Sequence, residues 1–246
     1  MKPIDYKQYD SKWASHKYAT KGENSTIKSA GCGITCSAMV IATLKNKSIT
    51  PLITAEWSMR NGYKALNQGT YYTYFVPQFK EYGIKCRQLN NSNVYHNPKS
   101  NVHDIAEKEL KNGNLVIAVM GKGLWTSGGH FVLAYKLKNG YVYINDPAST
   151  QSNRLKNKLS TWQNDIKYYW VIEVDKKDDN TATVNTNGGN LICRKIANKE
   201  GAIVGYFKSG TKLKVISKKY KKWWKVSGKN TKGDTIEGFC NVEFLS

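Results

Sequence analysis

Hydrophobic residues recur at helical spacing in the first part of the chain. After Gly31-Cys32-Gly33, apolar residues return every three or four positions through Ala38, Ile41 and Ala42. This spacing predicts a helix that begins at or just after Cys32. Three further helices are predicted over Leu52–Arg60, Tyr74–Tyr82 and Val102–Lys111, the last capped by Asn101 and followed by Gly113.

Short apolar runs typical of strands come later in the chain. They lie at Leu115–Met120, Phe131–Tyr135 and Tyr141–Ile144. Lys138-Asn139-Gly140 joins the last two and is a strong hairpin signal. Helices first and antiparallel strands afterwards predict an α+β fold and not a doubly wound parallel sheet.

The composition changes where the aromatic run Tyr168–Val174 gives way to charged residues. Such a change indicates a linker. With 246 residues, the chain is long enough for one domain with a sizeable core and a second, smaller one. We therefore predict a first domain over 1–174, a linker over 175–182 and an all-β domain over 183–246.

Cys32 is the first candidate for chemistry, because a helix N-terminus lowers the pKa of a cysteine and so favours the nucleophilic thiolate. The glycines beside it would let a substrate carbonyl approach, and the Cys32 amide could donate to an oxyanion. His130 is the candidate base, since it follows Gly128-Gly129 and begins a predicted strand. His96 and His103 are predicted to be surface residues.

The predicted hairpin brings Asp146 near His130, where a carboxylate would orient the imidazole and stabilise its cation. The neighbouring Asn145 could take the same role, so the choice between them stays open. Gly129 and Trp125 are the predicted substrate-binding residues of this site, although a core position for Trp125 is equally open. Cys32 and Cys36 are one helical turn apart but have no zinc-type partners, so neither a metal nor another cofactor is predicted.

These motifs resemble those of papain-clan cysteine peptidases of the double-glycine-leader, bacteriocin-processing type. The resemblance spans about Lys12 to Val174 and rests on Ser29–Thr35, Gly129–Val132 and Asn145-Asp146-Pro147. It implies a papain-like fold with Cys32 as nucleophile, His130 as base and Asp146 as orienting residue. One departure is Thr26, at the place where relatives often carry a glutamine that donates to the oxyanion; Asn24 and Tyr18 are weak substitutes.

The C-terminal part resembles bacterial SH3-like domains through Leu191–Arg194, Gly210-Thr211, Trp223–Val226 and Gly238-Phe239-Cys240. It holds 13 Lys and Arg against 4 Asp and Glu. Trp223 and Trp224 are the predicted ligand-binding residues, with one of them in the core and the other exposed. They follow a cluster of four lysines, Lys218, Lys219, Lys221 and Lys222. Cys193 and Cys240 are predicted to face the interior, and a disulfide between them is left open.

The net charge of +20 indicates an anionic partner. The sequence lacks the stripe of lysine, arginine and stacking aromatic residues that would indicate nucleic-acid binding. It also lacks an apolar run long enough to cross a membrane. The partner expected is the Gram-positive wall, either peptidoglycan or teichoic acid, bound by a monomer. Because Met1–Tyr6 lacks the apolar run of a signal peptide, we expect synthesis in the cytoplasm and action at the wall after release.

The function expected is therefore an endolysin-like peptidoglycan hydrolase, as in phage lysis. Both an endopeptidase and an N-acetylmuramoyl-L-alanine amidase cleave amides through an acyl-enzyme, so the sequence does not separate them. A cysteine peptidase that processes a peptide or protein is the second hypothesis. A non-catalytic wall-binding protein is the third.

Overall fold

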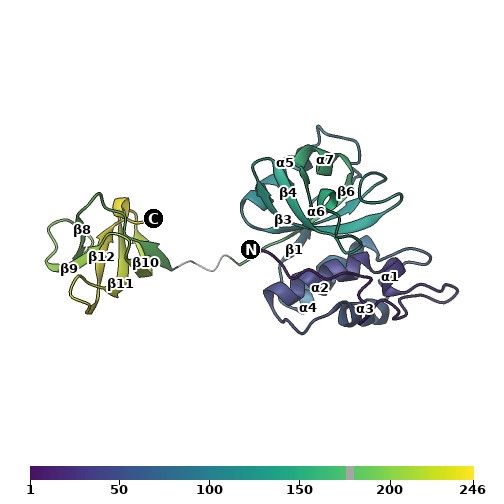
Figure 1. The fold of residues 1–246 in the computed structure, drawn as a ribbon, viewed down its shortest axis with the longest axis horizontal. Coiled ribbons are helices and arrows are strands. Elements are labelled where there is room, and N and C mark those ends of the chain that lie inside the picture. Colours follow the sequence, from purple (N-terminus) through teal and green to yellow (C-terminus); the bar gives the residue numbers. More distant parts are fainter. Residues whose placement is uncertain (176–179) are drawn as a thin grey trace. The chain divides into compact units, whose positions relative to one another are not determined.

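The computed structural model describes residues 1–175 and 180–246. The chain divides into two compact units, Met1–Val174 and Asp175–Ser246 (Figure 1). Half of the predicted linker, residues 176–179, lies outside the described residues. Its last two residues are not linker, because Thr181 and Ala182 belong to a strand of the second unit.

The first unit combines helices with one six-stranded antiparallel sheet of order β1-β6-β2-β3-β4-β5. The helices are α1 (Ile27–Ala30), α2 (Cys32–Leu44), α3 (Pro51–Arg60), η1 (Tyr72–Tyr74), α4 (Phe75–Glu81), α5 (Asn101–Lys111), α6 (Ser152–Leu155) and α7 (Leu159–Asn164). The strands are β1 (Cys86–Gln88), β2 (Leu115–Met120), β3 (His130–Lys138), β4 (Tyr141–Asn145), β5 (Lys156–Lys158) and β6 (Ile166–Ile172). The predicted helices and strands are confirmed to within a few residues, and so is the mixed fold.

One predicted helix end is wrong. Ser100, and not Asn101, caps α5, because its hydroxyl accepts a hydrogen bond from the Val102 N–H and Asn101 is already helical. Two polar residues in sequence could each cap a helix, and only the backbone path decides which one does.

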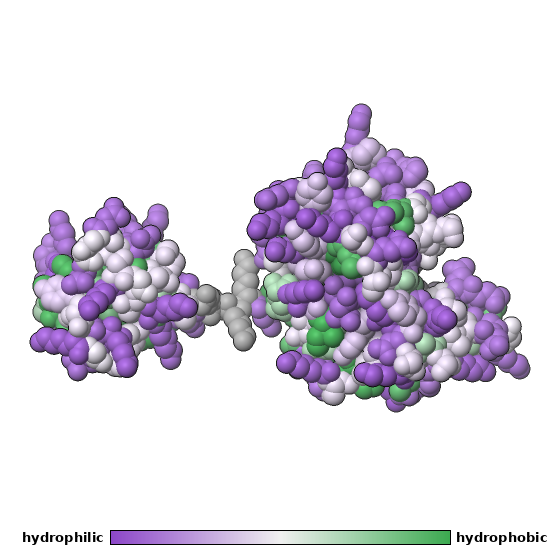
Figure 2. Space-filling view, viewed as in Figure 1, coloured by the Kyte–Doolittle hydropathy of each residue, from purple (hydrophilic) through white to green (hydrophobic). Residues whose placement is uncertain are grey.

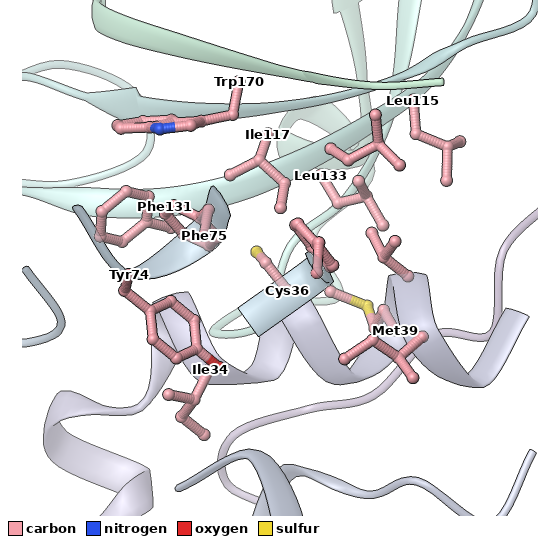
Figure 3. Close-up of a cluster of buried hydrophobic side chains, with 14 of the residues drawn as sticks. Ile34, Cys36, Met39, Tyr74, Phe75, Leu115, Ile117, Phe131, Leu133 and Trp170 are labelled. Carbon is pink, nitrogen blue, oxygen red and sulfur yellow. The ribbon is translucent and has the colours of Figure 1, made fainter. Parts of the chain in front are cut away.

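Helices cover both faces of this sheet, and this explains why β2 is apolar throughout. Leu115, Ile117 and Val119 face a core built with α2 and α4, while Val116 and Ala118 face a second core under α5. Figure 3 shows the first core, where Ile34, Cys36 and Met39 of α2 meet Ile117, Leu133 and Trp170 of the sheet. Packing on both faces fixes the sheet against the N-terminus of α2, and the candidate site lies at that junction.

The second unit is a six-stranded antiparallel sheet of order β7-β10-β11-β12-β8-β9 around its own small core. Its elements are β7 (Thr181–Thr183), β8 (Asn190–Arg194), β9 (Ile203–Lys208), β10 (Lys212–Tyr220), β11 (Trp223–Lys229), β12 (Thr235–Asn241) and η2 (Val242–Phe244). Cys193 and Cys240 are buried in that core as predicted, and both are free thiols.

Hydrophilic side chains cover much of the visible face of each unit (Figure 2). Among the described residues, no helix is long and apolar enough to span a bilayer. The same residues contain no cluster of three histidine, cysteine or acidic side chains suited to a metal ion.

Candidate active site

Cys32 is the first residue of α2, and its side chain is half-buried. The backbone N–H groups of a first helical turn have no partner within the helix, so they can donate to an anion. A side chain at Gly31 would clash with the carbonyl of Ile27, and one at Gly33 would lie 2.9 Å from Thr70 Oγ1. Both glycines are therefore required by the packing around Cys32.

His130 lies at the start of β3 and is 6% exposed. Its Nε2 atom is 2.7 Å from Asp146 Oδ1, and its ring also hydrogen-bonds the Cys32 thiol. Because Nε2 is engaged by the carboxylate, Nδ1 is the nitrogen that serves Cys32. The structure thus brings Cys32, His130 and Asp146 into one chain of hydrogen bonds.

Asp146 follows β4 and is fully buried. Its Oδ1 atom also accepts from the Ala148 N–H at 2.8 Å, and its Oδ2 atom accepts from Arg154 Nε at 2.7 Å. Asn145, the alternative left open by the sequence, turns away and donates to the Ile4 carbonyl at 3.2 Å. Asp146 is therefore the residue that contacts His130, and Arg154 is a supporting residue that sequence reasoning missed.

The charges of the three groups stabilise one another. Burial disfavours the Cys32 thiolate, but the hydrogen bond and positive charge of His130 outweigh it and lower the pKa of Cys32. Burial likewise opposes the imidazolium, yet hydrogen bonds to Asp146 and Cys32 raise the pKa of His130 to about 9. Burial would raise the pKa of Asp146, whereas the hydrogen bond and charge of His130 lower it. The site favours a thiolate beside an imidazolium.

Cys32 opens into a cleft of about 630 Å³. One wall comes from the loops 23–25 and 67–70, and the other includes Gly129, Phe131 and Tyr72. Most of the lining side chains are hydroxyls, amides or apolar groups. The cleft is large enough for a few residues of an extended peptide.

Gln8 is a second residue that sequence reasoning missed. Its N–H donates to the Pro147 carbonyl at 2.9 Å, and its Nε2 donates to the Lys28 carbonyl at 2.6 Å. The side chain therefore lies between the turn that follows Asp146 and the helix that precedes Cys32. The family resemblance implies a glutamine about six residues before the nucleophile, whereas Gln8 lies 24 positions before Cys32 and contacts Lys28 and Pro147 only through the fold.

The sequence pattern of the peptidase C39-like family matches residues 6–175 of this chain. The chain belongs to this family. It is thus a member of a family of cysteine peptidases, and the Cys32 site lies within the matched residues. Among curated protein sequences, none matches the chain.

Solved structures of similar proteins include other members of this class. A putative C39-like peptidase from Bacillus anthracis is 14% identical, with a TM-score of 0.41 over 58% of this chain and 88% of its own. A double glycine motif protease from an AMS/PCAT transporter, in complex with a leader peptide, is 19% identical, with a TM-score of 0.42 over 70% of this chain and 91% of its own.

Two of the predicted positions in the C39-like part of the chain need correction. Trp125 does not line the cleft: it is 2% exposed in the core, where its indole N–H donates to the Arg154 carbonyl. His103 is not a surface residue, since its ring bonds the Tyr169 hydroxyl at 2.7 Å and the Asn97 carbonyl at 3.0 Å. Long side chains in polar or glycine-rich segments can still turn inward when a buried partner receives them.

The structure also places the other residues that the sequence singled out. Gly129 lines the cleft as expected. In the second unit, Trp223 and Trp224 are both half-buried, so the prediction of one core and one exposed tryptophan is wrong. Thr26 caps α1 and shares a capping box with Ser29, so it replaces no catalytic glutamine. Tyr18 is fully buried and bonds Ser58 and Thr70.

Proposed function

We propose that this protein is a peptidoglycan hydrolase that cleaves amide bonds in the peptides of Gram-positive cell walls. The observation that carries the proposal is the hydrogen-bonded chain of Cys32, His130 and Asp146 at the edge of an open cleft. Such an arrangement supports nucleophilic attack on a carbonyl.

In the first step, the Cys32 thiolate attacks the carbonyl carbon of a wall peptide held in the cleft. The oxyanion that forms accepts a hydrogen bond from the Cys32 N–H at the start of α2. His130 then gives its proton to the leaving nitrogen, and the C–N bond breaks. This leaves a thioester on Cys32 and a free amine.

In the second step, His130 takes a proton from water, and the resulting hydroxide attacks the thioester. The carboxylic acid leaves, and Cys32 returns to the thiolate with His130 protonated. Asp146 stays ionised throughout and holds the imidazole through Nε2. Arg154 in turn holds the second oxygen of that carboxylate.

The second unit supplies the reason for proposing the wall as substrate. Its six short antiparallel strands around a small core are consistent with an SH3-like wall-binding domain. Its excess of lysine and arginine suits an anionic polymer such as the wall. Tethering the enzyme to an insoluble substrate raises the local concentration of scissile bonds. Action at the wall after release, as in phage endolysins, and a monomeric state are parts of the same proposal.

The test is digestion of purified Gram-positive walls followed by mass spectrometry of the soluble fragments. We expect the wild-type protein to release fragments with new amino groups and Cys32→Ala to release none. The position of the new amine identifies an endopeptidase or an N-acetylmuramoyl-L-alanine amidase. Cys36→Ala is the matched control, because Cys36 is a buried core thiol one turn further along α2.

Fragment release that persists in Cys32→Ala would contradict the nucleophile assignment. If no Gram-positive wall yields fragments although Cys32 remains reactive, processing of a peptide or protein becomes the better explanation. If Cys32 is also unreactive, a non-catalytic wall-binding role replaces both.

A further inference from the structure

The second unit carries a groove of about 480 Å³ that has no part in the chemistry at Cys32. It lies where β8 comes alongside the ends of β11 and β12. The side chains that matter for its chemistry are Ile192, Arg194, Lys199, Trp223, Asn241 and Phe244. These residues come from four separate segments, so the groove exists only in the folded unit.

Strand pairing places most of these side chains on one face of the sheet. Trp223 pairs with Asn241, and Arg194 pairs with Phe239. Opposite residues of antiparallel strands project from the same face, and alternate residues along β8 add Ile192 beside Arg194. The face therefore combines apolar side chains with a cationic one.

The charge of the groove has one sign. Arg194 and Lys199 both line it, and none of the described residues lining it is acidic. Arg194 is held in place because its NH1 donates to the Gly201 carbonyl at 2.8 Å, whereas Lys199 is exposed. A ligand with a carboxylate would gain charge-assisted hydrogen bonds here.

The apolar part of the groove is equally specific. Phe244 is 42% exposed, and Trp223, which is half-buried, lines the same groove. Trp224, next in the chain, is different: Lys218 Nζ lies 4.6 Å from its ring centroid, and the ring packs against the core. Trp223 is therefore the tryptophan placed to contact a ligand.

We propose that this groove binds a short peptide that carries a free carboxylate, as the peptides of the cell wall do. The proposal rests on the proposed function and specifies the ligand of the second unit. The apolar floor contacts alkyl side chains of the peptide, Asn241 lies within reach of its amide groups, and Arg194 and Lys199 bind the carboxylate.

A polyol phosphate chain, such as a teichoic acid, fits the groove less well. It has little apolar surface, so it would gain little from contact with Trp223, Phe244 and Ile192. Its repeated charges match the exposed lysines at the end of β10 and in the turn after it, Lys218, Lys219, Lys221 and Lys222, which lie outside the groove.

The test uses the full chain carrying Cys32→Ala, so that no probe is cleaved. Three probes are titrated by calorimetry and by tryptophan emission: the peptide Ala-Glu-Lys-Ala with free carboxylates, the same peptide with both carboxylates amidated, and a polyglycerol phosphate. Lys199→Gln and Trp223→Phe change the groove. Lys221→Gln is the matched control, because this exposed lysine lies outside it.

We expect the free peptide to bind and amidation to weaken binding roughly tenfold, the value of one charge-assisted hydrogen bond. Lys199→Gln should weaken binding of the free peptide by a similar factor and binding of the amidated peptide little. Trp223→Phe should weaken binding of both peptides. Lys221→Gln should change the binding of neither. Equal binding of the two peptides, equal effects of the two lysine variants, or binding of the polyphosphate alone would each overturn the proposal. Because Cys32 is absent, these results stand apart from wall digestion by the wild-type protein.

Discussion

Asp146 acts by stabilising the protonated form of His130. The buried carboxylate accepts from His130 Nε2 at 2.7 Å and is itself held by Arg154 and the Ala148 N–H. Between the lowered pKa of Cys32 and the raised pKa of His130, the pair exists as thiolate and imidazolium. These two limits belong to the coupled pair, so they set the pH range in which the enzyme is ready to react.

We predict a bell-shaped pH profile for kcat/KM, with its alkaline limb near pH 9, where His130 loses its proton. Asp146→Asn should move that limb to lower pH and reduce kcat by about 10² to 10⁴, because the charge that stabilises the imidazolium is gone. The rate of Cys32 alkylation by iodoacetamide, measured against pH, checks the shift without any substrate. Asp104→Asn, an exposed position on α5, is the matched control and should leave both profiles unchanged.

The same shifts affect stability in opposite directions. The raised pKa of His130 adds stability that is full below about pH 6.5, the ordinary histidine value, and is lost as the pH rises through about 9. The lowered pKa of Asp146 adds stability that is present above the ordinary aspartate value and lost as the pH falls through the folded value.

For the pH profile of kcat/KM, an unchanged alkaline limb in Asp146→Asn would contradict the role given to this carboxylate.

At the scale of elements, the cleft depends on two loops that a buried ion pair joins. Lys64 Nζ is 2.7 Å from Glu23 Oε1, and both side chains are almost fully buried. Glu23 Oε2 also accepts from Ser25 Oγ at 2.9 Å and from the Asn67 N–H at 3.0 Å. Because residues 23–25 and 67–70 form one wall of the cleft, this pair sets the shape of that wall.

Glu23→Gln should raise KM about tenfold while changing kcat less, because it disturbs the wall that binds substrate and not the reacting groups. The new amide would face Lys64 with a donor in place of an acceptor, so the urea midpoint should also fall. Glu109→Gln is the matched control: it removes the partner of Arg87 in an ion pair that lies away from the cleft. A loss of kcat with unchanged KM would place Glu23 in the chemistry instead.

At the scale of the whole molecule, two units with separate cores carry the chemistry and the proposed attachment. The second unit has a much higher density of positive charge, and salt screens such charge over about 8 to 10 Å. Attachment to the wall should therefore be sensitive to ionic strength, whereas the reactivity of Cys32, whose partners His130 and Asp146 are buried, should not.

Removing residues 175–246 should leave Cys32 alkylation and the cleavage of soluble wall fragments unchanged within about twofold. It should slow the digestion of intact walls by about 10²-fold or more, since the effective substrate concentration falls. Salt should slow the full chain on intact walls but have little effect on the shortened one. Equal rates of the two proteins on intact walls would show that the second unit does not serve attachment.

Local patterns predicted much of this structure because they act over a few residues. Gly31-Cys32-Gly33 before a helical repeat and Gly129-His130 before a strand singled out Cys32 and His130, and the hairpin count predicted Asp146 near His130, where the structure places it. The apolar runs predicted the strands, because a strand with one or both faces buried needs apolar residues within its own sequence. The prediction that Trp125 lines the cleft was wrong, because a glycine-rich loop pattern does not indicate where one long side chain packs.

The sequence by itself determined the helices and strands, the division into two units and the type of chemistry. Only the tertiary structure placed Asp146 rather than Asn145 against His130 and brought Arg154 to the Asp146 carboxylate. It alone paired Glu23 with Lys64, 41 positions away. Backbone preference and hydrophobic period act between near neighbours, whereas contacts between distant segments depend on how the packed elements fill space. For that reason the positions of the supporting residues could not be predicted from the sequence.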